Sequence, residues 1–463
     1  MNRTLAAAAA CLPLLAGPLA AGCTVAGNAS SGGDSVRVVV GYQSKTINTV
    51  TAGTLLRSLG YFEKRLNALG RSEGTTYSVV WQDYDTGAPI TAQMLAGKID
   101  IGSMGDYPLL INGSRAQAQG GDAETRLVSV TGYNLKGALN GVVVAKDSKA
   151  RTLRDLKGTT VSTSVGSAGH GTFVQAAKKY GFDGAEDVKV ENQQPSVGAT
   201  ALESGKAAGL SQFVAWPGVL VAQDRARLLY DGGDLNVPTF HGVVVRKKFA
   251  GDKPAILQEF LKAQIDATRY LNDNPVRSSE SVAATTGLPV EAVYLYNGAG
   301  GVSTFDVTLK KRLQDVLAHD VPFLKSIGVL QTPLDLSPFI DDSHIRRAYG
   351  SSYDADVAKT PVSGAGEIWF AGEQATRRFG DPVALLRGVR EAQEQGRNIK
   401  AAYVADATTG TRWFADKDVW VEDPKAGGAK RFQAFATDEV ARAYLAAHPG
   451  STIVTYQDAV ERA

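Results

Sequence analysis

The stretch TVSTSVGSAGHGTFVQAAKKYG, residues 160–181, joins a β-branched run to a helical pattern through a turn rich in Gly and Ser. The turn contains Gly166 and Gly169, which permit a sharp bend and a close backbone approach. We therefore predict a strand over 160–163 and a helix after the turn. Four residues mark one face of that helix at helical spacing: Phe173, Ala176, Ala177 and Tyr180.

The turn itself is a candidate ligand site. The first amides of a helix have no partner inside the helix and carry partial positive charge, which suits an oxyanion. The hydroxyls of Ser164 and Ser167 would lie beside these amides. The GxxxxGK[ST] pattern of a P-loop is absent. The alternative is that the turn is only a tight connection that begins a helix.

Strand-like and helix-like segments alternate on both sides of this unit, which is typical of an α/β fold with a largely parallel sheet. Apolar residues at helical spacing follow the first of these strands. The alternation resumes at about residue 141 and continues to about 345. The first segments after the tether are predicted as a strand over 35–43, a helix over 54–70, a strand over 76–84, a short helix over 91–98 and a strand from 99 that ends in a Gly-rich turn.

The sequence GVVV occurs twice, at 141–144 and at 242–245, each time followed by a cation, a polar turn and a helical stretch. Two such strands favour a chain that enters and leaves a second lobe, although any two buried strands can have this sequence. We expect a first lobe over 35–139 and 248–350, a second lobe over 140–247, and a cleft between them.

Ligands of open α/β sheets bind beyond the carboxyl ends of the strands. This rule selects four loops of the predicted lobes. They are GYQSKT at 41–46, GSMGDYPLL at 102–110, SVGSAGHG at 164–171 and QFVAWPG at 212–218.

The composition is that of an ordinary globular protein of 463 residues, with 44% hydrophobic and 21% charged residues. A formal net charge of +2 without a Lys/Arg-dense block argues against a nucleic-acid partner. Residues 1–22 have the pattern of a signal peptide, and LAAGC resembles a bacterial lipobox that would make Cys23 the lipidated first residue. An ordinary secretory signal is the alternative. We expect 23–34 to be a flexible tether on the extracytoplasmic side of a membrane, periplasmic or at the cell surface.

Catalytic and metal motifs are not found. The five His residues are scattered, and neither HExxH nor GxSxG occurs. Ser167 and His170 are three residues apart, which would fit a hydrolase, but no orienting carboxylate is identifiable. We therefore expect binding without turnover, no catalytic residue, no metal and no cofactor.

Several motifs occur in an order and spacing that resembles the solute-binding proteins of bacterial importers for aliphatic sulfonates, taurine and nitrate. They are GYQ after the first strand, the turn GDYP at 105–108, the LRDLKG…VGSAGHG segment and a Trp-containing loop of the second lobe. The resemblance covers about 35–349. It implies a type 2 periplasmic-binding fold, a small oxyanionic solute in the inter-lobe cleft, an ABC importer permease with its ATPase as partners, and a monomer. The cleft residues that it implies are Gln43, Asp106, Tyr107, Ser167, Ala168, His170 and Trp216; the turn chemistry adds Ser164 and Gly166.

Each of these positions has a structural alternative. Asp106 could cap the helix that Pro108 opens, His170 could be a polar residue at a helix start, Trp216 could be core, and Gln43 could be a surface residue. Tyr107 replaces a small residue of the family and would narrow the pocket. Trp216-Pro217-Gly218 stands where the family often has Trp-Asp-Pro, so a polar group could be missing. We interpret His241 as structural.

A small α+β domain is predicted over 367–463, after a linker over 351–366. Its expected elements are helices over 382–396 and 438–450, strands over 400–406, 430–437 and 451–457, and a strand pair over 411–423. Their succession resembles the NosL family of copper-carrying lipoproteins. Copper(I) needs soft sulfur ligands, whereas the family's Cys-Gly-Met is here Ser363-Gly364-Ala365, so the resemblance implies the fold without metal binding. An accessory or assembly protein, with the lobes as a scaffold, is the alternative function.

Overall fold

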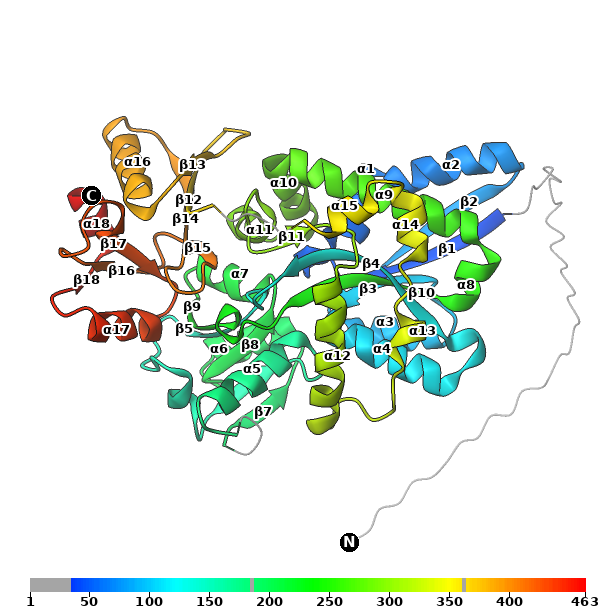
Figure 1. Ribbon diagram of the computed structural model, residues 1–463, viewed down its shortest axis with the longest axis horizontal. Coiled ribbons are helices and arrows are strands. Elements are labelled where there is room, and N and C mark those ends of the chain that lie inside the picture. The colour runs from blue at the N-terminus through cyan, green and yellow to red at the C-terminus, as the bar shows by residue number, and fades with distance from the viewer. Residues whose placement is uncertain (1–34, 184–186, 360–363) are drawn as a thin grey trace, which may run out of the picture.

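The computed structural model describes residues 35–183, 187–359 and 364–463 (Figure 1). The predicted signal peptide, the tether with Cys23, and Ser363 lie outside the described residues. Within those ranges, no helix has the length and apolar character needed to span a membrane.

The first lobe is built on a six-stranded mixed sheet. β1 runs parallel to β2 and β3, whereas β10 is antiparallel to both β3 and β4. The hydrophobic runs of these strands, apart from the edge strand β2, are buried on both faces, so the sheet must be covered by helices on both sides. In sheet order the strands are β11 (Thr304–Phe305), β4 (Thr125–Asn134), β10 (Thr239–Arg246), β3 (Ile101–Gly105), β1 (Ser35–Tyr42) and β2 (Thr76–Asp83).

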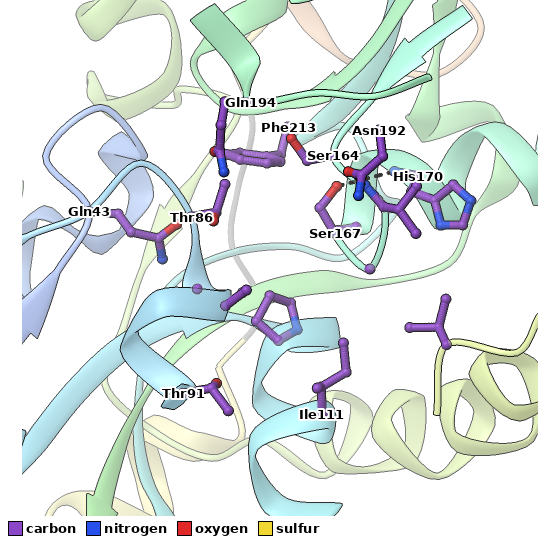
Figure 2. Close-up of a pocket in the computed structure, with 18 of the residues that line it drawn as sticks. Gln43, Thr86, Thr91, Ile111, Ser164, Ser167, His170, Asn192, Gln194 and Phe213 are labelled. Carbon is purple, nitrogen blue, oxygen red and sulfur yellow. Dashed lines mark hydrogen bonds between the residues drawn. The ribbon is translucent and has the colours of Figure 1, made fainter. Parts of the chain in front are cut away.

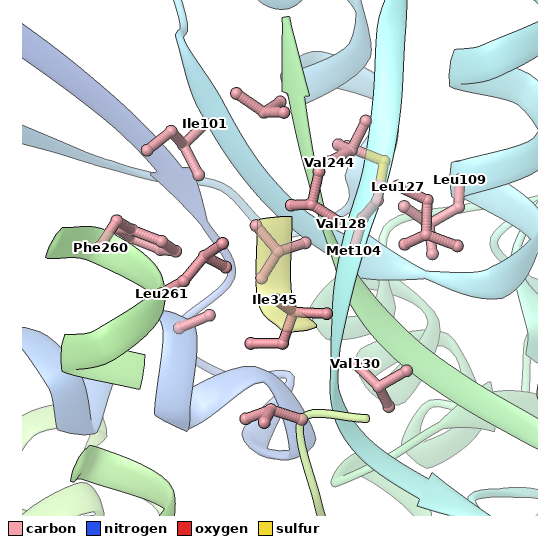
Figure 3. Packing of buried hydrophobic residues seen from close by; sticks show 14 of the residues in the cluster. Ile101, Met104, Leu109, Leu127, Val128, Val130, Val244, Phe260, Leu261 and Ile345 are labelled. Carbon is pink, nitrogen blue, oxygen red and sulfur yellow. The ribbon is translucent and has the colours of Figure 1, made fainter. Parts of the chain in front are cut away.

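Helices cover this sheet and bury the core drawn in Figure 3, where Val128 and Val244 of neighbouring strands lie among Phe260, Leu261 and Ile345 of the covering helices. The helical elements of the first lobe are η1 (Ile47–Ala52), α1 (Thr54–Leu59), α2 (Tyr61–Glu73), α3 (Gly87–Leu95), α4 (Asp106–Gln119), η2 (Gly121–Ala123), α8 (Lys247–Asp252), α9 (Pro254–Asp273), α10 (Pro275–Thr286), α11 (Val290–Asn297), α12 (Lys311–Ser326), α13 (Leu336–Phe339), α14 (Ser343–Tyr349) and α15 (Tyr353–Val357).

Two details of this lobe differ from the sequence prediction. The single helix expected over 54–70 is divided by Gly60, whose φ of +63° is left-handed and ends α1 before α2 begins. The linker expected over 351–366 begins with α15, because the Tyr353 side chain is buried in the first-lobe core and its hydroxyl accepts the Leu309 amide at 3.1 Å.

The second lobe contains a five-stranded sheet in which β6 is parallel to β7 and β8, and β5 is antiparallel to β8 and β9. In sheet order the strands are β7 (Lys189–Asn192), β6 (Thr160–Thr163), β8 (Gly209–Phe213), β5 (Asn140–Ala145) and β9 (Ala226–Asp231). The remaining elements are η3 (Leu153–Leu156), α5 (Ala168–Lys179), α6 (Pro195–Glu203), α7 (Trp216–Ala222) and η4 (Gly232–Leu235).

The two GVVV strands lie in different sheets. β5 opens the second-lobe sheet, whereas β10 pairs with β3 and β4 of the first lobe. The second lobe therefore does not extend to residue 247 as expected, because the backbone of β10 completes its hydrogen bonds in the six-stranded sheet. The chain crosses between the lobes at 135–139 and 236–238.

The C-terminal domain, residues 364–463, consists of two small antiparallel sheets and three α-helices. The strands expected to pair over 411–423 lie in separate sheets, since β15 pairs with β14, and β16 pairs with β17 and β18. The first sheet contains β13 (Arg377–Phe379), β12 (Gly366–Phe370), β14 (Ile399–Ala405) and β15 (Arg412–Phe414); the second contains β17 (Phe432–Phe435), β16 (Val419–Glu422) and β18 (Thr452–Val454). The helices are α16 (Pro382–Glu394), α17 (Asp438–Ala447) and α18 (Tyr456–Arg462), with η5 (Gly428–Lys430) between strands.

This domain contacts both lobes and lies at the end of the molecule opposite α2 and α8 (Figure 1). Its contact with the first lobe includes a hydrogen bond from the Tyr403 hydroxyl to the Glu291 carbonyl at 2.9 Å. Its contact with the second lobe includes the ion pair between Lys417 and Asp224 at 2.8 Å. A shared hydrophobic cluster joins all three parts, with Trp369 and Trp413 of the domain packed among residues of both lobes.

Candidate functional site

A cavity of about 520 Å³ lies between the two lobes, at the carboxyl ends of their parallel strands. Figure 2 shows Gln43 and Thr86 of the first lobe facing Ser164, Ser167 and Gln194 of the second. The first lobe supplies Gln43, Thr86, Gly87, Ala88, Thr91, Gly105, Pro108, Ile111, Arg115, His241 and 327–329; the second supplies 164–168, His170, 192–194 and Phe213.

The β6–α5 turn forms one wall of the cavity. Gly166 has a φ of +86°, which turns the chain sharply, and Ser167 is the N-cap of α5. The Ser167 hydroxyl accepts the His170 amide at 3.3 Å, whereas the amides of Ala168 and Gly169 donate to no group in the described chain. The positive end of α5 therefore has two unpaired donors, and Ala168, which carries one of them, lines the cavity.

Hydrogen bonds hold the second-lobe side of the site rigid. The Ser164 hydroxyl donates to the Gln193 carbonyl at 2.9 Å and accepts from the Gln212 amide nitrogen at 3.1 Å. The Val165 amide donates to Asn192 Oδ1 at 3.0 Å. These contacts connect the β6–α5 turn to the start of α6, so two helix N-termini of the second lobe lie at the same wall.

The first lobe adds the start of α3. Thr86 is its N-cap and Gly87 its first residue, and both line the cavity. A Cβ at Gly87 would lie 2.7 Å from Pro108 Cβ, so only a glycine lets the starts of α3 and α4 approach this closely. The start of α4 also lines the cavity, through Gly105 and Pro108. Helix N-termini of both lobes thus surround one volume.

The electrostatics of the site favour an anion. None of the described residues that line the cavity is Asp or Glu, and Arg115 is an exposed cation without an ion pair in the described chain. Burial lowers the pKa of His241 to about 3 and also lowers the pKa of His170, so both rings are neutral near pH 7. His241 Nδ1 lies 2.5 Å from the Asn48 amide nitrogen, which makes Nδ1 the acceptor.

Six of the nine predicted ligand residues line this cavity: Gln43, Ser164, Gly166, Ser167, Ala168 and His170. His170 is buried, and its Nδ1 has no hydrogen-bond partner in the described chain. Gln43 is also buried and donates from its amide nitrogen to the Ser103 carbonyl at 3.2 Å, so it is not a surface residue. His241, which the sequence assigned a structural role, lines the cavity too.

The structure places Asp106, Tyr107 and Trp216 outside this cavity. The Asp106 carboxylate accepts the Thr239 hydroxyl at 2.7 Å and the Phe240 amide at 3.2 Å, which ties α4 to β10. Burial raises the pKa of Asp106 to about 6. Trp216 is half-buried against the shared hydrophobic cluster, because α7 packs onto α11.

Tyr107 does not narrow the cavity as expected. Its ring crosses to the second lobe and packs on Gly171, and its hydroxyl accepts from the Gln175 amide nitrogen at 2.9 Å. Together with Asp106 and Asp320 it borders a separate space of about 20 Å³.

Sequence reasoning missed several lining residues. The start of α3 was predicted at residue 91, although Thr86 before Gly-Ala-Pro is a helix-start signal. The segment Asn192-Gln193-Gln194 precedes Pro195, which stands at the first turn of α6. Arg115 follows Pro108 and Ile111 at helical spacing on α4, a signal visible in the sequence.

Comparisons with known proteins agree with this architecture. Residues 84–278 match the family model described as NMT1/THI5 like. A putative aliphatic sulfonates-binding protein of Escherichia coli K12 is 27% identical over 273 residues, which cover 59% of this chain and 78% of the relative. The taurine-binding periplasmic protein of the same organism is 26% identical over 241 residues, 51% of this chain and 70% of the relative.

Solved structures share the fold of the two lobes. The alkanesulfonate-binding protein SsuA from Xanthomonas axonopodis pv. citri, bound to MOPS, matches with a TM-score of 0.56 and 20% identity over 66% of this chain and 99% of that one. The nitrate-binding protein NrtA from Synechocystis PCC 6803 matches with a TM-score of 0.53 and 11% identity over 72% of this chain and 94% of that one. The predicted periplasmic-binding fold, followed by a small C-terminal domain, is confirmed.

Proposed function

We propose that this protein binds a small oxyanionic solute, of the sulfonate, taurine or nitrate type, between its two lobes and delivers it to an ABC importer. One observation carries the proposal: the cavity is bordered by helix N-termini of both lobes, with the Ala168 amide free at its wall and no carboxylate among its described lining residues. Such a site offers donors and positive potential without a competing anion.

The location of the relatives supports an extracytoplasmic protein that contacts a permease and its ATPase. The two binding proteins of Escherichia coli align with 273 and 241 residues of this chain, and one of them is named as periplasmic. We infer that Cys23 carries a lipid anchor and that the protein acts as a monomer on the outer side of the membrane.

We infer binding rather than turnover. The Ser167 hydroxyl accepts the backbone amide of His170, and no hydrogen bond joins it to the His170 ring in the described chain. A nucleophile and a base need such a contact to act together. The cavity therefore supplies donors to a bound anion and no activated nucleophile.

Titration calorimetry with taurine, ethanesulfonate and nitrate tests the proposal, with ethanolamine as the matched molecule without an oxyanion. We expect at least one of the three anions to bind and ethanolamine to give no heat. Arg115→Gln should weaken binding of the anion about tenfold or less, because Arg115 is exposed and solvent screens its charge. Arg71→Gln, an exposed cation on α2, is the control. A folded protein that binds none of the anions would favour an accessory or assembly role instead.

A further inference from the structure

A second cavity, of about 510 Å³, lies where the C-terminal domain meets the first lobe. It shares no lining residue with the inter-lobe cavity. Three segments form most of its wall: 134–136 after β4, 297–305 after α11, and 409–412 before and within β15. The two cavities are therefore separate sites on one molecule.

The second cavity has cations and no carboxylate among its described lining residues. Lys136 donates to the Thr409 carbonyl at 2.6 Å and Arg312 donates to the Leu135 carbonyl at 3.1 Å, and neither has an ion pair in the described chain. Arg412 is compensated, because Glu367 lies 2.8 Å from its guanidinium. Two uncompensated positive charges thus border this volume.

Three buried side chains at the wall keep a polar atom without a partner in the described chain: Asn297 through Oδ1, Ser303 through Oγ and Arg412 through Nε. They are 2%, 5% and 7% exposed, respectively. A buried polar group without a hydrogen bond costs free energy, and because each of these atoms is almost fully covered, a ligand would recover that cost by displacing the wall slightly. Ser303 and Arg412 offer donors, whereas the Asn297 Oδ1 atom can only accept, because its amide nitrogen already donates to the Ile47 carbonyl at 2.8 Å.

We propose that this cavity is a second ligand site, which takes a small hydroxylated molecule carrying a phosphate or carboxylate group. The cations and the free donors fit the oxyanion, and the Asn297 acceptor fits a hydroxyl of the same molecule. The volume exceeds that of a lone inorganic anion and is close to that of the inter-lobe cavity.

The position of this site connects it to the lobes. The segment 134–136 leads into the first crossover, and Asn236, which also lines the cavity, lies in the second. An occupant would contact both crossovers and the loop at 409–412 of the C-terminal domain. It would therefore favour the docked arrangement of that domain, as any ligand of a folded state does.

Calorimetry on the full-length protein with glucose 6-phosphate, gluconate and glucose tests the site. We expect at least one of the two anions to bind and glucose to bind at least tenfold more weakly. The double substitution Lys136→Gln with Arg312→Gln should weaken binding of that anion at least tenfold. The control, Lys64→Gln with Arg71→Gln, replaces two exposed cations on α2 and should change the affinity less than twofold. Absence of binding by both anions, equal binding of glucose, or equal effects of the two double variants would overturn the proposal.

Hydrogen–deuterium exchange with the anion that binds locates it independently. Protection of peptides covering 297–305 and 409–412, without protection of 164–170, is the expected result. Protection of 164–170 alone would place the anion in the inter-lobe cavity and refute the second site. Since taurine, ethanesulfonate and nitrate are titrated separately, failure of the inter-lobe proposal is distinguishable from failure of this one.

Discussion

The ring of Tyr107, at the start of α4 in the first lobe, lies directly on Gly171 of α5 in the second lobe. A Cβ at position 171 would lie 2.0 Å from Tyr107 Cε2, so the two helices approach this closely only because residue 171 is a glycine. The contact sets the spacing of α4 and α5 immediately behind the cavity wall that carries the free amide of Ala168.

Gly171→Ala should therefore displace Tyr107 or separate the two helices. We expect a loss of about 1–3 kcal/mol in the free energy of unfolding, because the added methyl overpacks a buried contact, and a solute affinity at least tenfold weaker. Urea unfolding and calorimetry measure the two effects. Gly251→Ala on α8, where a Cβ meets no atom within 4 Å and φ is not positive, is the control without a clash. A Gly171→Ala protein with unchanged affinity would contradict the role of this contact.

The unpaired Ala168 amide can be removed without breaking α5. Ala168 is the first residue of the helix, a position that tolerates proline, and the extended backbone of Ser167 suits a residue before proline. Ala168→Pro should weaken binding of the anion about tenfold to hundredfold, as expected for a lost hydrogen bond to a charged group. The melting temperature should change little.

Two variants control this experiment. Ala168→Val adds bulk at the same position but keeps the N–H, and Lys311→Pro places proline at the first residue of α12, away from the amides in question. Equal affinities for Ala168→Pro and Ala168→Val would show that the amide donates nothing to the anion.

Asp231 makes the free energy of unfolding of this protein depend on pH. It lies at the end of β9, faces Asp406 and Asp418 of the C-terminal domain, and burial raises its pKa to about 6. A carboxyl whose pKa is raised on folding retains its proton in the folded state, so its contribution to stability is greatest below about pH 4 and is lost as the pH rises through about 6.

Asp231→Asn should remove this dependence. The stability of the unmodified protein relative to Asp231→Asn is expected to fall by up to about 3 kcal/mol between pH 4 and pH 7. Urea unfolding of both proteins over this range measures the difference. The asparagine oxygen can still accept the Gly233 amide, which donates to Asp231 at 2.9 Å. Parallel stability curves for the two proteins would contradict the assignment.

The elements that depend on local sequence were predictable. The β-branched run of 160–163 forms β6, and the Gly/Ser turn after it begins α5 and lines the cavity. The two-lobed architecture was likewise predictable from continuous hydrophobic runs that alternate with segments of helical spacing. A strand that is buried on both faces of its sheet has such a continuous run.

The direction of a single side chain was not predictable. Tyr107 turns away from the cavity because Gly171, on an element distant in sequence, leaves room for its ring. Trp216 packs toward the core because the Gly218 amide donates to the Tyr296 hydroxyl at 3.1 Å and brings α7 against α11. Asn297 and Ser303 carry no local signal for a site, since their cavity exists only where the C-terminal domain meets the first lobe.

The packing of the C-terminal domain predicts that its tryptophans have different effects on solute binding. Trp369 is fully buried in the cluster shared with both lobes, 5.1 Å between ring centroids from Tyr294 of α11, whereas Trp420 is fully buried within the domain's own core. Either substitution to Ala should lower the free energy of unfolding by about 3–5 kcal/mol. Only Trp369→Ala should also change the solute affinity, because the void left by removing this indole borders residues of both lobes, whereas the void left at Trp420 lies within the domain. Calorimetry at a temperature where both variants remain folded measures this difference, and equal affinities in the two variants would mean that the lobes bind solute independently of the domain.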